Sequence, residues 1–305
     1  MTETTSLAVA MIGLGSMGLG MAKSLLASGH TVSGYDVTAS ATAALGDLGA
    51  RACTSPADAA KGAQIAVVVV VNAAQTEAVL FGDNGIVPAM VPGGVVISCA
   101  TMAPDAVRAL AERCSQRDIH YLDAPMSGGA ARAGTGELTF MASGSPHAFA
   151  VARPALDAMA GKVYELGEAP GIGASFKIVN QLLAGVHIAA ACEAITFASK
   201  LGLDIDKVYE VITASAGNSW MFENRVPHIL EGDYAPKSAV NIFTKDLGIV
   251  SDIGRTETFP LPIAASALQL FLATAAAGMG RDDDASPARL IAQITGINLP
   301  QAKEH

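Results

Sequence analysis

A glycine-rich stretch near the start of the chain has the residue types and spacing needed to bind a phosphate. Gly13, Gly15 and Gly18 form a GxGxxG pattern between an apolar run and a run with helical character. In such a pattern the first glycine permits a tight turn, the second lets the backbone approach a pyrophosphate, and the third lets a helix pack on a strand. Backbone N–H groups at the start of the helix then meet the phosphate charge. The predicted cofactor loop also contains Leu14, Ser16 and Met17.

One acidic residue favours a particular dinucleotide. GxGxxG alone is also found in ordinary glycine turns, but here it follows a predicted strand and opens a predicted helix. Asp36 ends the next predicted strand about 20 residues later, as a dinucleotide site requires. A carboxylate there accepts hydrogen bonds from the adenosine ribose and repels a 2′-phosphate, and Val37, not an arginine, follows it. The sequence therefore predicts NAD rather than NADP.

A second short stretch, MSGGA, has the donors for a carboxylate. Ser127, Gly128 and Gly129 offer backbone N–H groups with little side-chain bulk, and Ser127 adds a hydroxyl. Successive backbone N–H groups of this kind can form an anion-binding nest. An ordinary Gly-Gly turn is the alternative.

One lysine stands in an otherwise apolar helical run. Lys177 is followed one turn later, on the same face, by Asn180 and Gln181. A lysine in this position either takes a proton as a general base or extends its ammonium group to solvent, and periodicity alone leaves both open. As a base it needs a lowered pKa, which desolvation and a positive nicotinamide ring would provide.

Composition and motifs exclude several other chemistries. The net charge of -9 gives no broad basic surface for nucleic acid or for an anionic membrane. The four cysteines lie far apart, and the histidines show no HExxH spacing, so we predict neither a metal site nor a disulfide framework, and a reducing cytoplasm fits best. No GxSxG stretch indicates a serine hydrolase. The charge cluster RDDDA, residues 281–285, is interpreted as a solvated loop.

The elements that must position these residues alternate in the first half of the chain. Helical patterns separate strand patterns at residues 7–13, 30–36, 63–72 and 93–101, with shorter candidates at 119–125 and 137–144. This alternation predicts a doubly wound α/β sheet. After about residue 167 the pattern becomes helical, beginning with a long helix from 174 to 201. We therefore predict a Rossmann domain over residues 1–167 and an all-helical domain over 168–305, joined by the long helix.

One helical stretch raises the question of a membrane. Residues 259–280 carry no charge and are long enough to span a bilayer. Pro260 and Pro262 open the stretch, Gln269 lies in its middle, and alanine contributes little to insertion. We interpret it as a buried helix of a protein without a membrane span.

Four motifs in order resemble one family. The stretches GLGSMGLGMAKSL, DAPMSGGAARAGTGELTFMASG, GIGASFKIVNQLL and KDLGIV are similar to those of the β-hydroxyacid dehydrogenases, and together they cover nearly the whole chain. NQLLAGVHIAAACEA and NSWMFENRVPHILEGDY most resemble the L-threonate dehydrogenase branch. The resemblance implies NAD-dependent oxidation of a small polyhydroxy acid. Tartronate semialdehyde or 3-hydroxyisobutyrate chemistry, and a non-catalytic NAD-binding module, are the alternatives.

The resemblance also implies roles for individual residues. Lys177 matches the catalytic lysine of the family, and the MSGGA stretch matches its substrate motif. Many relatives have two asparagines after the lysine, so whether Asn180 or Gln181 contacts the substrate stays open. Further positions match cofactor contacts of the family, namely Val71, Asn72, Thr76, Thr101 and Lys245. Apolar helices in the second domain predict a homodimer or homotetramer.

Overall fold

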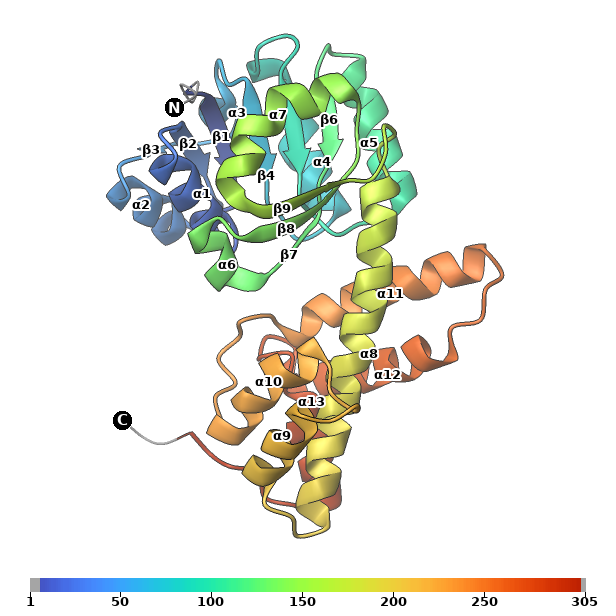
Figure 1. The fold of residues 1–305 in the computed structure, drawn as a ribbon. Coiled ribbons are helices and arrows are strands. Elements are labelled where there is room, and N and C mark those ends of the chain that lie inside the picture. The colour runs from blue at the N-terminus through green and yellow to red at the C-terminus, as the bar shows by residue number, and fades with distance from the viewer. Residues whose placement is uncertain (1–5, 303–305) are drawn as a thin grey trace. The chain divides into compact units, whose positions relative to one another are not determined.

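Six parallel strands form the central sheet of the first of two compact units. The computed structural model describes residues 6–302, and these divide between Lys177 and Ile178 (Figure 1). The strand order is β3-β2-β1-β4-β5-β6, the order of a dinucleotide-binding doubly wound sheet. The strands are β1 (Ala8–Ile12), β2 (Thr31–Tyr35), β3 (Arg51–Ala52), β4 (Ile65–Val68), β5 (Val95–Ser98) and β6 (His120–Asp123). The predicted fold class is confirmed.

Helices cover both faces of this sheet because its strands are apolar on both faces. Along β4 every residue is buried. Val67 belongs to one apolar cluster with Met21 and Leu25, whereas its neighbours Ala66 and Val68 belong to another. Successive strand residues point to opposite faces, so two separate cores form. The helices of this unit are α1 (Gly18–Ala27), α2 (Ala39–Asp47), α3 (Pro56–Ala60), α4 (Ala73–Phe81), η1 (Val87–Ala89), α5 (Pro104–Ser115), α6 (Gly129–Thr135) and α7 (Pro146–Met159).

A smaller three-stranded sheet follows β6. Its order is β7-β8-β9, formed by Met126–Ser127, Leu138–Ala142 and Ala160–Glu165. Strand β8 alternates buried and half-buried residues, so its pattern is visible in the sequence, whereas β9 is mostly exposed. This sheet carries Ser127, and its strand β8 continues into Ser143, which pairs through a bridge with Asp123 at the end of β6.

The long helix α8 (Ile172–Lys200) begins in the first unit and continues into the second. The predicted domain boundary, between residues 167 and 168, falls in the loop before this helix. The compact units instead divide at 177/178, because the first turn of α8 is hydrogen-bonded to the ends of the strands. Lys177 therefore belongs to the sheet unit.

Helices joined by loops form the second unit, and its described residues include one isolated β-bridge, between Ala239 and Asp283. Its apolar core gathers residues of α8 together with Phe222, Phe243 and Phe271, and the last two rings stack at 5.2 Å. Small residues of α8 let the helices approach, since a Cβ at Gly185 would lie 2.9 Å from the Leu247 side chain. Beside α8 the unit contains α9 (Ile205–Thr213), α10 (Trp220–Glu231), α11 (Val240–Thr256), α12 (Pro262–Thr274), η2 (Ala275–Met279) and α13 (Pro287–Thr295).

The uncharged stretch 259–280 is not buried on all sides, and that prediction is wrong for the single chain. It forms α12 and η2, in which one stripe containing Ala264, Ala267 and Phe271 is buried while Ile263 and Leu272 are exposed. By length and composition alone, both Ile172–Lys200 and Pro262–Met279 could cross a membrane. Half of the apolar window of the first is buried inside the protein, but only 28% of that of the second.

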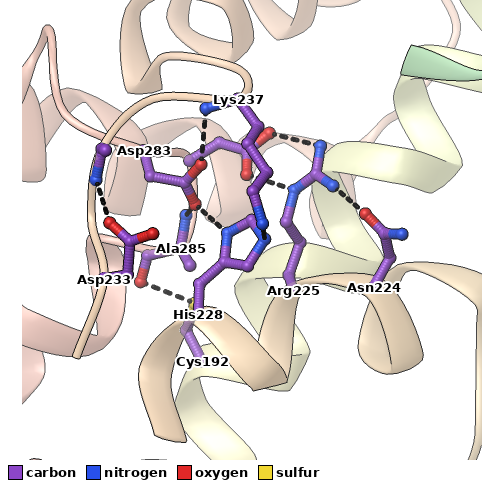
Figure 2. Close-up of polar contacts among 10 residues, drawn as sticks. Cys192, Asn224, Arg225, His228, Asp233, Lys237, Asp283 and Ala285 are labelled. Atoms are coloured by element: carbon purple, nitrogen blue, oxygen red, sulfur yellow. Dashed lines mark hydrogen bonds and ion pairs between the residues drawn. The ribbon is translucent and has the colours of Figure 1, made fainter. Parts of the chain in front are cut away.

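The charge cluster at residues 281–285 is also not the solvated loop that the sequence suggested. Asp283 and Asp284 are completely buried, and each pairs with a side chain from a distant segment. Figure 2 shows Asp283 directed at His228. Asp283 Oδ1 lies 2.8 Å from His228 Nδ1, and His228 Nε2 lies 2.9 Å from Lys237 Nζ. Asp284 pairs with Arg225, whose Nε donates to Oδ1 at 2.5 Å. These contacts hold the segment against α10.

Candidate functional site

The glycine loop connects β1 to α1 in a conformation that only glycine permits at its ends. Gly13 has φ +91°, and a Cβ there would lie 2.2 Å from the Val69 carbonyl oxygen. A Cβ at Gly18 would lie 1.9 Å from the Gly13 carbonyl oxygen. A Cβ at Gly15, by contrast, meets open space among the described residues. The first and third glycines thus close the turn, and the second leaves its outer side clear for a pyrophosphate.

Asp36 joins the end of β2 to this loop. Its Oδ2 accepts a hydrogen bond from the Leu14 N–H at 2.7 Å, and its Oδ1 accepts one from the Thr38 N–H at 2.7 Å. A carboxylate has about four acceptor positions, so about two remain for other donors. The carboxylate is therefore both a brace for the loop and an acceptor suited to ribose hydroxyls.

A cavity of about 490 Å³ opens beside this loop. Its lining includes Leu14, Gly15 and Ser16 of the loop, Lys23 of α1 and Ser40 of α2. The lining is mainly apolar with a few polar groups, as is common in ligand sites. Loop, carboxylate and cavity together fit a bound NAD.

The segments after β4 and β5 reach the same edge of the sheet. The chain order reverses between β1 and β4, and ligands of such sheets bind beyond the carboxyl ends of the strands at this reversal. Val71 is exposed, and the Asn72 side chain accepts from the Gln75 N–H at 2.9 Å, so that α4 begins immediately after it. Thr76 therefore lies inside α4, completely buried, and not in the loop. Thr101 follows β5 and is half-buried.

The MSGGA stretch crosses from β7 into α6. Ser127 pairs with Thr139 of β8, which fixes the stretch to the smaller sheet. Gly128 and Gly129 have φ +139° and +75°, values that strain any residue with a side chain. A Cβ at Gly128 would also come within 3.1 Å of the Arg132 side chain. The glycines are thus required by the backbone, which agrees with either a nest or a plain turn.

Lys177 does not extend to solvent. Only 8% of the residue is exposed, and its Nζ donates to the Met126 carbonyl oxygen at 2.8 Å. Met126 immediately precedes Ser127, so the amine lies beside the predicted carboxylate-binding stretch. The structure therefore removes the alternative left open by periodicity, and it brings together two of the predicted site components.

In the helical unit, the two amides after this lysine have different surroundings. Gln181 is buried, its Oε1 accepts from Asn180 Nδ2 at 2.9 Å, and its Nε2 donates to Asp246 Oδ2 at 2.5 Å. Asp246 Oδ1 also forms an ion pair with Lys245 Nζ at 2.5 Å. Both ends of the Gln181 amide are thus engaged within the protein, whereas Asn180 is only half-buried.

Comparison with known proteins shows the family of the chain. Residues 8–167 match the model of the NAD-binding domain of 6-phosphogluconate dehydrogenase, and residues 171–291 match that of NADP-dependent 3-hydroxyisobutyrate dehydrogenase. An L-threonate dehydrogenase of Cupriavidus necator is 51% identical over 97% of this chain and 99% of its own length. This chain belongs to the β-hydroxyacid dehydrogenase family.

The assignment to the β-hydroxyacid dehydrogenase family is supported by further relatives in sequence and in structure. An L-threonate dehydrogenase of Escherichia coli K12 is 46% identical over 97% of each chain. The crystal structure of a 3-hydroxyisobutyrate dehydrogenase from Salmonella typhimurium superimposes with a TM-score of 0.89 at 45% identity, covering 92% of this chain and 99% of the other. The sheet unit is therefore an NAD-binding domain, and the chain is a hydroxyacid oxidoreductase.

Sequence reasoning missed three buried polar residues, two in the sheet unit and one in the helical unit. Asp123 and Ser143 are buried at the ends of strands in the sheet unit, and Asp246 is buried in the helical unit between Gln181 and Lys245. Burial raises the pKa of Asp123 to about 6, although hydrogen bonds from Ala174 and Gly171 oppose this shift. Asp123 and Asp246 lie within the stretches DAPMSGG and KDLGIV, so the motifs contained the signal, but nothing in the sequence showed that these carboxylates would be buried.

Proposed function

We propose that this chain oxidises L-threonate at C2 to 2-dehydro-L-erythronate, with NAD as the oxidant. The observation that carries the proposal is the buried amine of Lys177, held at the Met126 carbonyl beside Ser127 in an NAD-binding domain. The identity to L-threonate dehydrogenases over nearly the whole chain supports this particular substrate.

Each component has a task in this reaction. The Gly13–Gly18 loop and Asp36 would hold NAD, which would supply the acceptor for the hydride of the carbinol carbon. Lys177, in its neutral form, takes the hydroxyl proton, and the same group as an ammonium donates it in the reverse direction. The backbone N–H groups at Ser127, Gly128 and Gly129, with the Ser127 hydroxyl, bind the substrate carboxylate. Holding these groups in one geometry lowers the entropic part of the barrier.

The residues of the helical unit are assigned by their surroundings. We assign Asn180 to the substrate hydroxyls and Gln181 to a supporting role, because the Gln181 amide is already engaged at both ends. Lys245 is assigned to the cofactor, as are Val71, Asn72, Thr76 and Thr101 of the sheet unit. For Thr76 the support is weakest, since its hydroxyl donates to the Asn72 carbonyl inside α4.

The exposed apolar residues of the helical unit support an assembly of identical chains. Phe197, Leu201, Ile263 and Ile294 are each at least 59% exposed. Exposed apolar surface of a subunit is often covered by a partner in an assembly. We propose that a second copy of the chain covers it in a homodimer or homotetramer, rather than a membrane. The four cysteines are free and buried, which supports a cytoplasmic location.

A panel of C3 to C5 hydroxy acids, assayed for NADH formation, tests the substrate. L-threonate should give the highest kcat/KM. A higher kcat/KM with 3-hydroxyisobutyrate, or with tartronate semialdehyde in the reducing direction, would show that this compound and not L-threonate is the preferred substrate. No turnover with any acid, together with intact NADH binding, would leave only an NAD-binding module.

A lysine substitution tests the mechanism. Lys177→Ala should lower kcat by about 10²-fold or more, the range of general base catalysis. NADH affinity should change less than twofold. In the parent, kcat should rise with pH because oxidation requires the neutral amine of Lys177, and this rise should disappear in Lys177→Ala. The control is Lys61→Ala, on an exposed lysine after α3, which should retain the parent rate. A Lys177→Ala variant with most of its kcat and the parent pH profile would remove Lys177 from the mechanism.

A further inference from the structure

The first turn of α8, the helix that carries Lys177, receives its N-terminal cap from other segments of the chain. The helix begins at Ile172, and Gly171 before it has no side chain with which to cap. Asp123 Oδ2 accepts hydrogen bonds from the Gly171 N–H at 3.0 Å and from the Ala174 N–H at 2.8 Å. Ser143 Oγ accepts one from the Gly173 N–H at 2.9 Å. Three N–H groups at this helix start thus depend on two distant side chains.

This cap is buried, and it holds the helix tightly against the strands. Asp123 is 1% exposed and Ser143 is fully buried. A Cβ at Gly173 would lie 2.3 Å from the Met141 carbonyl oxygen and 2.9 Å from that of Asp123. The backbone of α8 therefore lies directly on the ends of β6 and β8. A negative charge at a helix N-terminus also interacts favourably with the helix dipole.

The same carboxylate stands next to the segment that holds the proposed reaction site. Asp123 is the last residue of β6, and Met126, whose carbonyl accepts the Lys177 Nζ, follows three residues later. Along the helix, Lys177 lies three residues after Ala174, which is nearly one turn. Asp123 is thus hydrogen-bonded to the start of the helix that carries Lys177, and it lies in the same short segment of chain as Met126 and Ser127.

We propose that Asp123 is a positioning residue that fixes the Lys177 amine relative to the segment from Met126 to Gly129. Ser143 supports it with one further bond. The catalytic part of this inference rests on the proposed function, whereas the structural part does not. A misplacement of about 1 Å in such an arrangement can cost roughly 10²-fold in rate. The effect should therefore fall on kcat more than on cofactor binding.

Four variants separate positioning from general destabilisation. Asp123→Ala removes both bonds, Asp123→Asn keeps an oxygen acceptor without the charge, and Ser143→Ala removes only the Gly173 bond. The matched control is Asp204→Ala, because Asp204 also caps a helix, accepting from the Asp206 and Lys207 N–H groups of α9, which carries no proposed site residue. If Asp123→Ala does not fold, Asp123→Asn and Ser143→Ala decide the question.

Two readouts need no substrate. Amide hydrogen exchange of a peptide spanning residues 171–177, and the rate at which an amine-specific reagent labels Lys177, are followed by mass spectrometry. In Asp123→Ala both rates should rise at least about fivefold, with smaller increases in Asp123→Asn and in Ser143→Ala. Parent values should persist in Asp204→Ala. Parent rates in Asp123→Ala would overturn the proposal even if the enzyme assay failed.

The third readout is steady-state kinetics. In Asp123→Ala, kcat should fall roughly ten- to hundredfold while the NADH Kd stays within twofold, and Asp123→Asn should recover part of the loss. An equal fall in kcat and in NADH affinity would indicate general damage and would overturn the positioning role. If the parent oxidises no hydroxy acid, the proposed function fails, and the exchange and labelling rates still decide whether Asp123 positions Lys177.

Discussion

Replacing Asp36 should change which dinucleotide the protein prefers. In the structure the carboxylate uses one acceptor position on the Leu14 N–H and one on the Thr38 N–H, each at 2.7 Å. About two positions remain, and the ribose diol of NAD offers two hydroxyl donors. A 2′-phosphate placed there would instead meet a like charge, and Val37, which is 90% exposed, offers no compensating cation.

The size of the effect follows from these bonds. Hydrogen bonds to a charged group contribute about 1.5–3 kcal/mol each. A loss of about 2 kcal/mol in Asp36→Ala raises the Kd for NADH roughly 30-fold, at about 1.4 kcal/mol per factor of ten. The Kd for NADPH should stay constant or fall, because the repulsion is removed. Asp36→Asn keeps an acceptor for the Leu14 N–H, so its loss of NADH affinity should be smaller.

Fluorescence titration of NADH and of NADPH measures both constants without any substrate. Asp83→Ala is a suitable control, because Asp83 is an exposed acid in the loop after α4. Its two dissociation constants should match those of the parent. The reasoning is refuted if Asp36→Ala changes the NADH constant less than threefold, or if the parent binds NADH and NADPH equally well.

Three further perturbations test other parts of the structure. Gly128→Val should raise KM for the hydroxy acid at least tenfold, because a side chain at this strained and crowded position disturbs the backbone N–H groups proposed to bind the carboxylate. The NADH Kd should stay nearly unchanged, because Gly128 is outside the predicted cofactor loop. An unchanged KM would place the carboxylate-binding groups elsewhere. Burial raises the pKa of Asp123 from 3.8 to about 6, so between these pH values the folded chain holds a proton that the unfolded chain has lost. The free energy of unfolding of the parent should therefore fall by roughly 2 kcal/mol, relative to Asp123→Asn, as pH rises from about 4 to about 6 in urea titrations, and a flat difference would contradict the assignment. His228→Ala should lower the free energy of unfolding by about 3 kcal/mol, because it leaves Asp283 buried without its ring partner, and calorimetry should show this with the NADH Kd unchanged.

The sheet could be predicted because its strands are continuous apolar runs that are buried on both faces. Residues 63–72 and 93–101 contain β4 and β5 for this reason. Three strands gave no such signal. β7 contains only two half-buried residues. β3 contains only two residues, both exposed, and β9 is mostly exposed, so neither has an apolar pattern to detect. Their positions depend on pairing with neighbours, which a local pattern does not contain.

The site could be predicted where its chemistry depends on the backbone. A Cβ at Gly18 would meet the Gly13 carbonyl within the loop, and a Cβ at Gly13 would meet the Val69 carbonyl directly after β4, so both positions require glycine and their spacing is informative. The surroundings of Gln181 were not predictable, because its partner Asp246 lies 65 residues away. Burial of Asp283 was missed for the same reason, since its partner His228 is 55 residues distant and the local sequence RDDDA is typical of a solvated loop.

Three aspartates in this chain show why residue type alone does not determine a role. Asp36 is half-buried, and its unused acceptor positions can bind a ligand. Asp123 is buried, and both of its helix contacts are backbone N–H groups, so its charge acts on the position of α8. Burial opposes ionisation of Asp283, but hydrogen bonds from the His228 imidazole and from backbone N–H groups outweigh it and lower the pKa of Asp283. These contacts stabilise a loop of the helical unit. Asparagine substitutions at the three positions should therefore affect three different measurements. Asp36→Asn should change the dinucleotide preference, Asp123→Asn should change the labelling rate of Lys177, and Asp283→Asn should change only the free energy of unfolding.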